Sequence, residues 1–74
     1  MPIHEIMDQT GHTTIKFDAA NTVELSEAME RFSDLTSKGY RAATRKVGEH
    51  DYTLVKDFDP TVDETLFIPQ MKGG

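Results

Sequence analysis

The chain contains no cysteine, and none of its apolar stretches approaches the length of a membrane-spanning helix. Without cysteine there can be no disulfide, no thiolate-bound zinc and no cysteine nucleophile, which fits a reducing compartment. A bilayer requires about 18 consecutive apolar residues, and no basic start is followed by an apolar run as in a secretory signal. We therefore expect a cytoplasmic protein that does not enter a membrane.

Basic residues are also scarce, because 8 of them stand against 13 acidic residues and leave a net charge of −5. A phosphate backbone would be repelled at long range, so we expect no nucleic-acid partner and favour a basic protein surface instead. The 74 residues allow one small domain, and a hydrophobic content of 36% is enough to build a core. We expect this domain to be a monomer.

The clearest pattern in the sequence is an amphipathic helix over residues 22–38. Asn21 is followed three residues later by Glu24, a variant of the capping box, and Gly39 supplies a left-handed cap at the other end. An apolar stripe at helical spacing predicts the core-facing side: Leu25, Ala28, Met29, Phe32 and Leu35. Charged residues are expected to face away from it: Glu24, Glu27, Glu30, Arg31 and Asp34.

Five β-prone runs surround this helix: residues 3–7, 12–17, 40–47, 52–58 and 65–69. The first two flank a Thr-Gly turn and predict a hairpin. One helix cannot bury its apolar face on one hairpin, so we expect an α+β fold with a mixed four- to five-stranded sheet packed on the helix, in the order ββαββ(β). An α+β sandwich with a meander is the alternative. The predicted organisation is one domain over residues 1–69 and a flexible tail over residues 70–74.

No group of residues predicts an active site or a metal site. His4, His12 and His50 are far apart and lack the spacing of metal ligands, so we expect solvated histidines and no metal or cofactor. The acidic run over residues 57–64 lacks the order of a calcium loop. The serines of the helix lack the turn of a nucleophile elbow. We therefore expect a protein that is not an enzyme.

A basic cluster on the third predicted strand is the one candidate docking surface. Pairing of these charges with neighbouring acids is the plainer interpretation, and a protein-docking patch is the functional one, because arginine and tyrosine are enriched at interfaces. The candidate docking residues are Tyr40, Arg41, Arg45 and Lys46, with Tyr52 nearby and Met71 close to the last residue.

The sequence given ends in Gly73-Gly74, just after the last predicted strand. A tail without side chains can thread a narrow channel and lie flat in an active site. Residues 10–15 resemble the first hairpin turn of ubiquitin, and residues 64–74 resemble its last strand and tail. With the helix between them, these segments resemble the β-grasp fold of the ubiquitin-like superfamily. The C-terminal stretch is equally similar to the bacterial sulfur-carrier branch.

The resemblance implies a small modifier whose C-terminal glycine is the working end. A partner enzyme would adenylate the Gly74 carboxylate with ATP, and the glycine would pass through a cysteine of the partner to a lysine of a target, forming an isopeptide bond. In the sulfur-carrier alternative, sulfide would intercept the adenylate and form a thiocarboxylate. Candidate lysines for chain formation are Lys16, Lys38, Lys46 and Lys56. A third hypothesis is a non-enzymatic interaction module of phage or bacterial origin.

Overall fold

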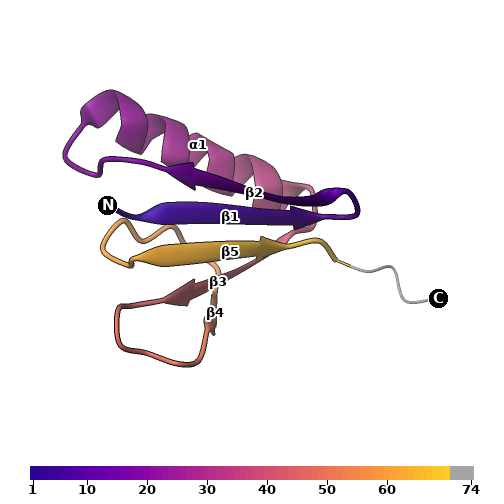
Figure 1. Cartoon of the computed structure of the whole chain (residues 1–74). Coiled ribbons are helices and arrows are strands. Elements are labelled where there is room, and N and C mark those ends of the chain that lie inside the picture. Colours follow the sequence, from indigo (N-terminus) through magenta and orange to yellow (C-terminus); the bar gives the residue numbers. More distant parts are fainter. Residues whose placement is uncertain (71–74) are drawn as a thin grey trace.

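A single α-helix lies across one face of a five-stranded sheet in the computed structural model, which describes residues 1–70 (Figure 1). The elements in chain order are β1 (Ile3–Asp8), β2 (Gly11–Lys16), α1 (Thr22–Ser37), β3 (Arg41–Arg45), β4 (Thr53–Val55) and β5 (Glu64–Ile68). The predicted α+β class, with a mixed sheet and one helix, is confirmed. Three strands follow the helix, so the order is ββαβββ and the optional last strand is present.

The last strand of the sequence lies in the middle of the sheet. The spatial order is β2-β1-β5-β3-β4, with β1 and β5 parallel and the other neighbours antiparallel. β5 therefore has a partner strand along both edges. Its residues 64–67 pair with β1, and its residues 64–68 pair with β3. Figure 1 shows that β5 ends on the side of the sheet opposite to the N-terminus.

The predicted first hairpin is confirmed, and its turn is held by a short side chain. Asp8 Oδ1 accepts hydrogen bonds from the backbone N–H of Thr10 at 2.8 Å and from its hydroxyl at 2.6 Å. Gly11 then adopts φ +135°, a conformation that other residues rarely take. Two local features, an Asx turn and a glycine, thus fix where β1 ends and β2 begins.

The predicted helix is also confirmed, and both of its ends are capped as expected. The Asn21 side chain accepts from the N–H groups of Val23 at 3.0 Å and Glu24 at 3.1 Å. Glu24 completes the cap differently from a standard capping box, because its carboxylate accepts from Asp18 N–H. At the other end, Gly39 has φ +98° and the N–H of Tyr40 bonds back to the carbonyl of Leu35, which gives a Schellman motif.

The core lies between α1 and the sheet and is built largely from phenylalanine. Phe67 is fully buried, and its ring lies 5.7 Å from that of Phe32 in an edge-to-face arrangement. Ala42 completes the buried cluster, and Ile6, Leu35, Tyr40, Val55 and Phe58 pack around it. Strand alternation divides the sheet into two faces. We call the side under α1, with His4 and Phe67, the covered face. The other side, with Glu5, Arg45, Leu54 and Glu64, is the open face.

Three expectations about the core are wrong. Met29 is 51% exposed, because the helix packs on the sheet along the line of Ala28 and Phe32 and leaves Met29 to one side. Arg31 does not face away from the core, since its guanidinium reaches His4. The fourth strand covers Thr53–Val55 instead of residues 52–58, because the chain bends after Val55 and Phe58 packs on the core from outside the sheet.

Within residues 1–70, no helix is both long enough and apolar enough to cross a bilayer. The predictions that concern Met71, Gly73 and Gly74 fall outside the residues that the structure describes.

Candidate functional site

The predicted docking residues do not form one patch. Arg45 and Tyr52 belong to a polar network on the open face, where they meet an acid from β5. Tyr40 and Arg41 line a groove at the other end of β3. Lys46 is exposed in the turn that follows β3. The structure therefore divides the cluster into a paired group, Arg45 and Tyr52, and an unpaired group, Tyr40 and Arg41, whose side chains form no ion pair or hydrogen bond within residues 1–70.

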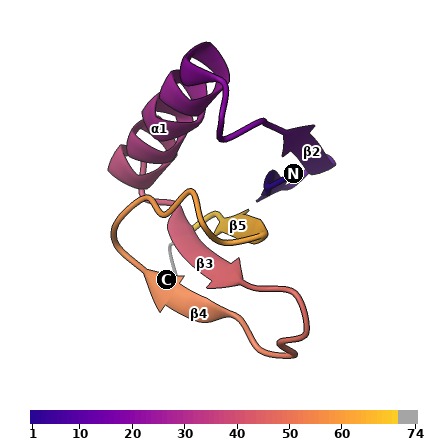
Figure 2. The ribbon, with the colours of Figure 1, turned by 90° about the vertical axis from the view of Figure 1, so that its left-hand side faces the viewer.

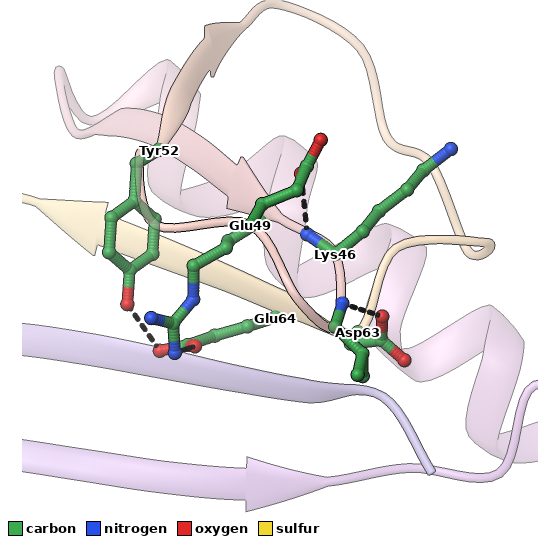
Figure 3. A network of polar contacts seen from close by, with 7 residues as sticks. Lys46, Glu49, Tyr52, Asp63 and Glu64 are labelled. Carbon is green, nitrogen blue, oxygen red and sulfur yellow. Dashed lines mark hydrogen bonds and ion pairs between the residues drawn. The ribbon is translucent and has the colours of Figure 1, made fainter.

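The paired group is centred on the carboxylate of Glu64, a residue that is only 8% exposed although it lies on the open face. One oxygen of Glu64 forms an ion pair with Arg45 at 2.7 Å, and the other accepts a hydrogen bond from the Tyr52 hydroxyl at 2.7 Å. The Arg45 guanidinium also lies 5.0 Å from the centre of the Tyr52 ring. Figure 3 shows the Tyr52 hydroxyl pointing toward the Glu64 carboxylate.

A second carboxylate, that of Glu5 on β1, adjoins this network. The hydrogen bond with Glu64, reinforced by burial and by the negative charge of Glu64, raises the pKa of Glu5. Burial opposes ionisation of Glu64, but hydrogen bonds from Tyr52, Glu5 and Arg45 outweigh it and lower its pKa. The hydrogen bond to Glu64 likewise raises the pKa of Tyr52. Of the two carboxyl groups, Glu64 therefore loses its proton at the lower pH and Glu5 at the higher pH.

Two backbone-to-carboxylate bonds hold the turn between β3 and β4 beside the network. The N–H of Lys46 donates to Glu49 at 2.8 Å, and the N–H of Val47 donates to Asp63 at 2.6 Å (Figure 3). The ammonium group of Lys46 is left pointing away from these contacts. All four candidate acceptor lysines are exposed, and Lys38 also forms an ion pair with Asp34 at 3.1 Å. Their exposure does not distinguish one acceptor from another.

The unpaired group lines a groove of about 480 Å³ where the end of α1 meets β3 and β4. Tyr40 and Ala42 contribute from the β3 side and Val55 from β4, while Arg41 and Lys56 are the charged lining residues. None of the lining residues that the structure describes is acidic. The sequence pattern predicted Tyr40 and Arg41 as docking residues, whereas Lys56 was predicted only as an acceptor lysine.

The prediction that His4 is exposed to solvent is wrong. We expected a solvated histidine, but its side chain is completely buried on the covered face, between the rings of Phe17 and Phe67. Burial, with a smaller contribution from the positive charge of Arg31, lowers its pKa to about 4. The neutral ring accepts from Arg31 at Nδ1 over 3.0 Å, and its Nε2 has no hydrogen-bond partner among residues 1–70. Alternation with Ile6 suggested a buried His4, but Ile3 suggested the opposite face for burial, so the sequence pattern was ambiguous.

Within the described part of the chain, no three histidine, aspartate or glutamate side chains converge on a metal-binding geometry. Comparison of the chain with protein-family models, with curated proteins and with solved structures finds no match.

Proposed function

We propose that this protein has a β-grasp fold and acts as a ubiquitin-like small modifier, whose Gly74 carboxylate is activated with ATP by a partner enzyme and joined to a target amine. The observation that carries the proposal is the Gly73-Gly74 pair, which follows β5 after residues 69–72. Glycine has no side chain to obstruct an enzyme channel, so the pair suits close approach to a nucleotide.

The arrangement of the sheet supports this role. One helix on a five-stranded mixed sheet is compatible with a β-grasp layout. β5 is hydrogen-bonded to β1 on one side and to β3 on the other, so the strand that precedes the tail is held along both edges. A partner that draws the tail into its active site would pull on a strand anchored along both edges. The folded body then serves as a rigid handle for the tail.

The proposed chemistry takes place in the partner. The Gly74 carboxylate would attack the α-phosphate of ATP, forming an acyl adenylate and releasing pyrophosphate. A cysteine thiolate of the partner would displace AMP and form a thioester. A target lysine amine would then attack the thioester, form the isopeptide bond and release the thiol. The modifier itself contributes the carboxylate and the surface that the partner holds.

The test is to isolate affinity-tagged protein from cells of its source and measure its intact mass and its adducts. The proposal requires a free Gly74 carboxylate in the working protein, which the intact mass reads directly. Trypsin cleaves after Lys72, so each conjugated target lysine should carry a diglycine remnant. Deletion of Gly73-Gly74, or Gly74→Val, should abolish these adducts, whereas Gln70→Ala serves as the matched control and should retain them.

Three results would overturn the proposal, and each points to a different function. A mass increase equal to replacement of one terminal oxygen by sulfur, without lysine-linked adducts, identifies a sulfur carrier. Biological activity that survives deletion of Gly73-Gly74 identifies an interaction module. Lysine adducts that persist in the Gly74→Val variant show that another part of the chain forms them.

A further inference from the structure

The groove at the end of α1 combines an apolar floor with a cationic rim. Ala42 is 2% exposed and Val55 packs against the core, so these two residues lie at the bottom of the groove. Arg41 and Lys56 are exposed and lie on its rim. Tyr40 presents an aromatic ring and a hydroxyl beside them. Apolar contact area next to a few polar anchors is typical of ligand-binding sites.

The charges on the rim are unusual for this molecule. The net charge of the chain is −5, yet two cations adjoin one groove whose described lining has no acid. Two ion pairs are found within residues 1–70, Lys38 with Asp34 and Arg45 with Glu64, and neither includes Arg41 or Lys56. Arg45, on the same strand as Arg41, is by contrast paired with Glu64. The two rim cations favour an anionic ligand.

The groove also runs along the edge of the sheet. β4 pairs with β3 alone among the described strands, so its outer edge has backbone groups that another strand can use (Figure 2). Val55 lies on the covered face, as does Ala42, its partner in the register, and Leu54 lies on the open face opposite Ala43. Arg41 lies on the open face by alternation within β3, and Lys56 lines the groove directly after β4, where the chain bends. A strand added at this edge would meet Tyr40 and Val55 with one set of side chains and the two cations with the other.

We propose that this groove binds an extended acidic peptide of a partner protein, which adds a strand to the edge of β4. Alternate apolar side chains of the peptide pack against Tyr40 and Val55, and the intervening carboxylates face Arg41 and Lys56. A second copy of this chain fits less well, because pairing through β4 brings two like-charged rims together on molecules that already repel each other. The proposal is independent of Gly73-Gly74.

The probe for the test is a fluorescein-labelled peptide of alternating glutamate and valine, with a matched peptide in which lysine replaces each glutamate. Binding is measured by fluorescence anisotropy, and the site is mapped from amide chemical shifts of the full chain. We expect the acidic peptide to bind at least about tenfold more tightly than the basic one. The largest shifts should fall on residues 53–56 and on Tyr40.

Two double variants separate the local charge of the groove from the total charge of the molecule. Arg41→Glu with Lys56→Glu should weaken binding of the acidic peptide by about tenfold or more. Lys16→Glu with Lys46→Glu changes the net charge by the same amount at exposed positions away from the groove and should leave binding within about twofold. Circular dichroism confirms that both variants are folded.

Several outcomes would overturn the proposal. If neither peptide binds, the rim cations serve to keep the β4 edge from pairing with other chains. Equal weakening by the two double variants would show that only the overall charge matters. Chemical shifts concentrated on β2, the other edge of the sheet, would place the site there. Sedimentation of a dimer that dissociates in the Arg41→Glu, Lys56→Glu variant would identify a second copy as the occupant.

Discussion

The two faces of the sheet each contain a buried polar side chain, and they accommodate it in different ways. On the covered face His4 is fully buried among phenylalanine rings and keeps one nitrogen without a partner among the described residues. On the open face Glu64 is almost as buried, but both of its oxygens are bonded, one to Arg45 and one to Tyr52. On the covered face the buried group is neutral, and on the open face the buried charge is paired.

The reason for the difference lies in the chemistry of the two groups. A histidine can lose its proton near neutral pH at modest cost, so burial without a counter-charge is tolerable as long as the pH stays above its pKa in the unfolded chain. A carboxylate is charged at neutral pH, and leaving it buried without a partner costs more than holding an arginine and a tyrosine against it. The covered face should therefore respond to packing and acid, and the open face to the loss of charge.

The strongest test of the comparison is Phe67→Ala, which empties the centre of the covered face. Phe67 is 0% exposed and contacts the rings of both His4 and Phe32. We expect a loss of about 3–5 kcal/mol in unfolding free energy, which rivals the whole stability of a domain this small. Urea denaturation followed by circular dichroism measures it. Ile68→Ala, on the same strand but on the open face, is the control and should cost about 1 kcal/mol. Equal losses would contradict the assignment of the core.

The second test is the dependence of stability on pH, because the protonation of His4 changes with pH. Its pKa is about 4 in the folded chain and 6.5 in the unfolded chain, so between these values only the unfolded chain binds the proton. The contribution of His4 to the unfolding free energy is fully present above pH 6.5. It decreases by about 3 kcal/mol as the pH falls to 4. Urea midpoints between pH 7 and pH 4 give the slope.

The variant His4→Leu should flatten that slope, since leucine fills the same pocket without titrating. His50→Leu makes the same substitution at an exposed histidine and is the matched control. A nuclear magnetic resonance titration of the His4 ring provides an independent reading. A ring that titrates near 6.5 in the folded protein would contradict its burial.

The third test removes the charge at the centre of the open face. Glu64→Gln keeps the shape of the side chain but weakens its bond to the Tyr52 hydroxyl, and we expect a loss of about 1 kcal/mol in unfolding free energy at pH 7. The pKa of Glu5 should also fall toward its usual value, because the hydrogen bond with Glu64 is the largest cause of its rise. Carboxyl-carbon chemical shifts report this pKa. Glu30→Gln, on the exposed side of α1, should alter neither quantity.

Local signals in the sequence predicted much of the fold. Asn21 and Gly39 predicted the two ends of α1 within one residue, because capping depends on side chains and φ angles at the helix ends themselves. The hairpin of β1 and β2 was predicted from equally local signals. The bounds of β4 were not predicted, because Phe58 leaves the sheet to reach a core assembled from distant segments.

The candidate site was harder to predict, since it depends on long-range register. The proximity of Arg45 to Tyr52 follows from one hairpin and was expected. Their partner Glu64 comes from β5, and only the pairing of Arg45 with Glu64 across the sheet brings it there. His4 lies in a run, Ile3-His-Glu-Ile6, whose two isoleucines point to opposite faces, so alternation alone did not identify the buried side. The pairing of β1 with β5 places His4 on the covered face, together with Phe67.

The smallest expected effect tests where the covered face ends. Helical spacing placed Met29 in the same stripe as Phe32, and a core methionine replaced by alanine would cost about 2–5 kcal/mol. Met29 is 51% exposed, and alanine is the better helix former, so Met29→Ala should change the unfolding free energy by less than about 0.5 kcal/mol. Phe32→Ala, one turn further along, is the control and should cost several times more, because Phe32 is 5% exposed. A large loss from Met29→Ala would mean that the covered face extends around the helix.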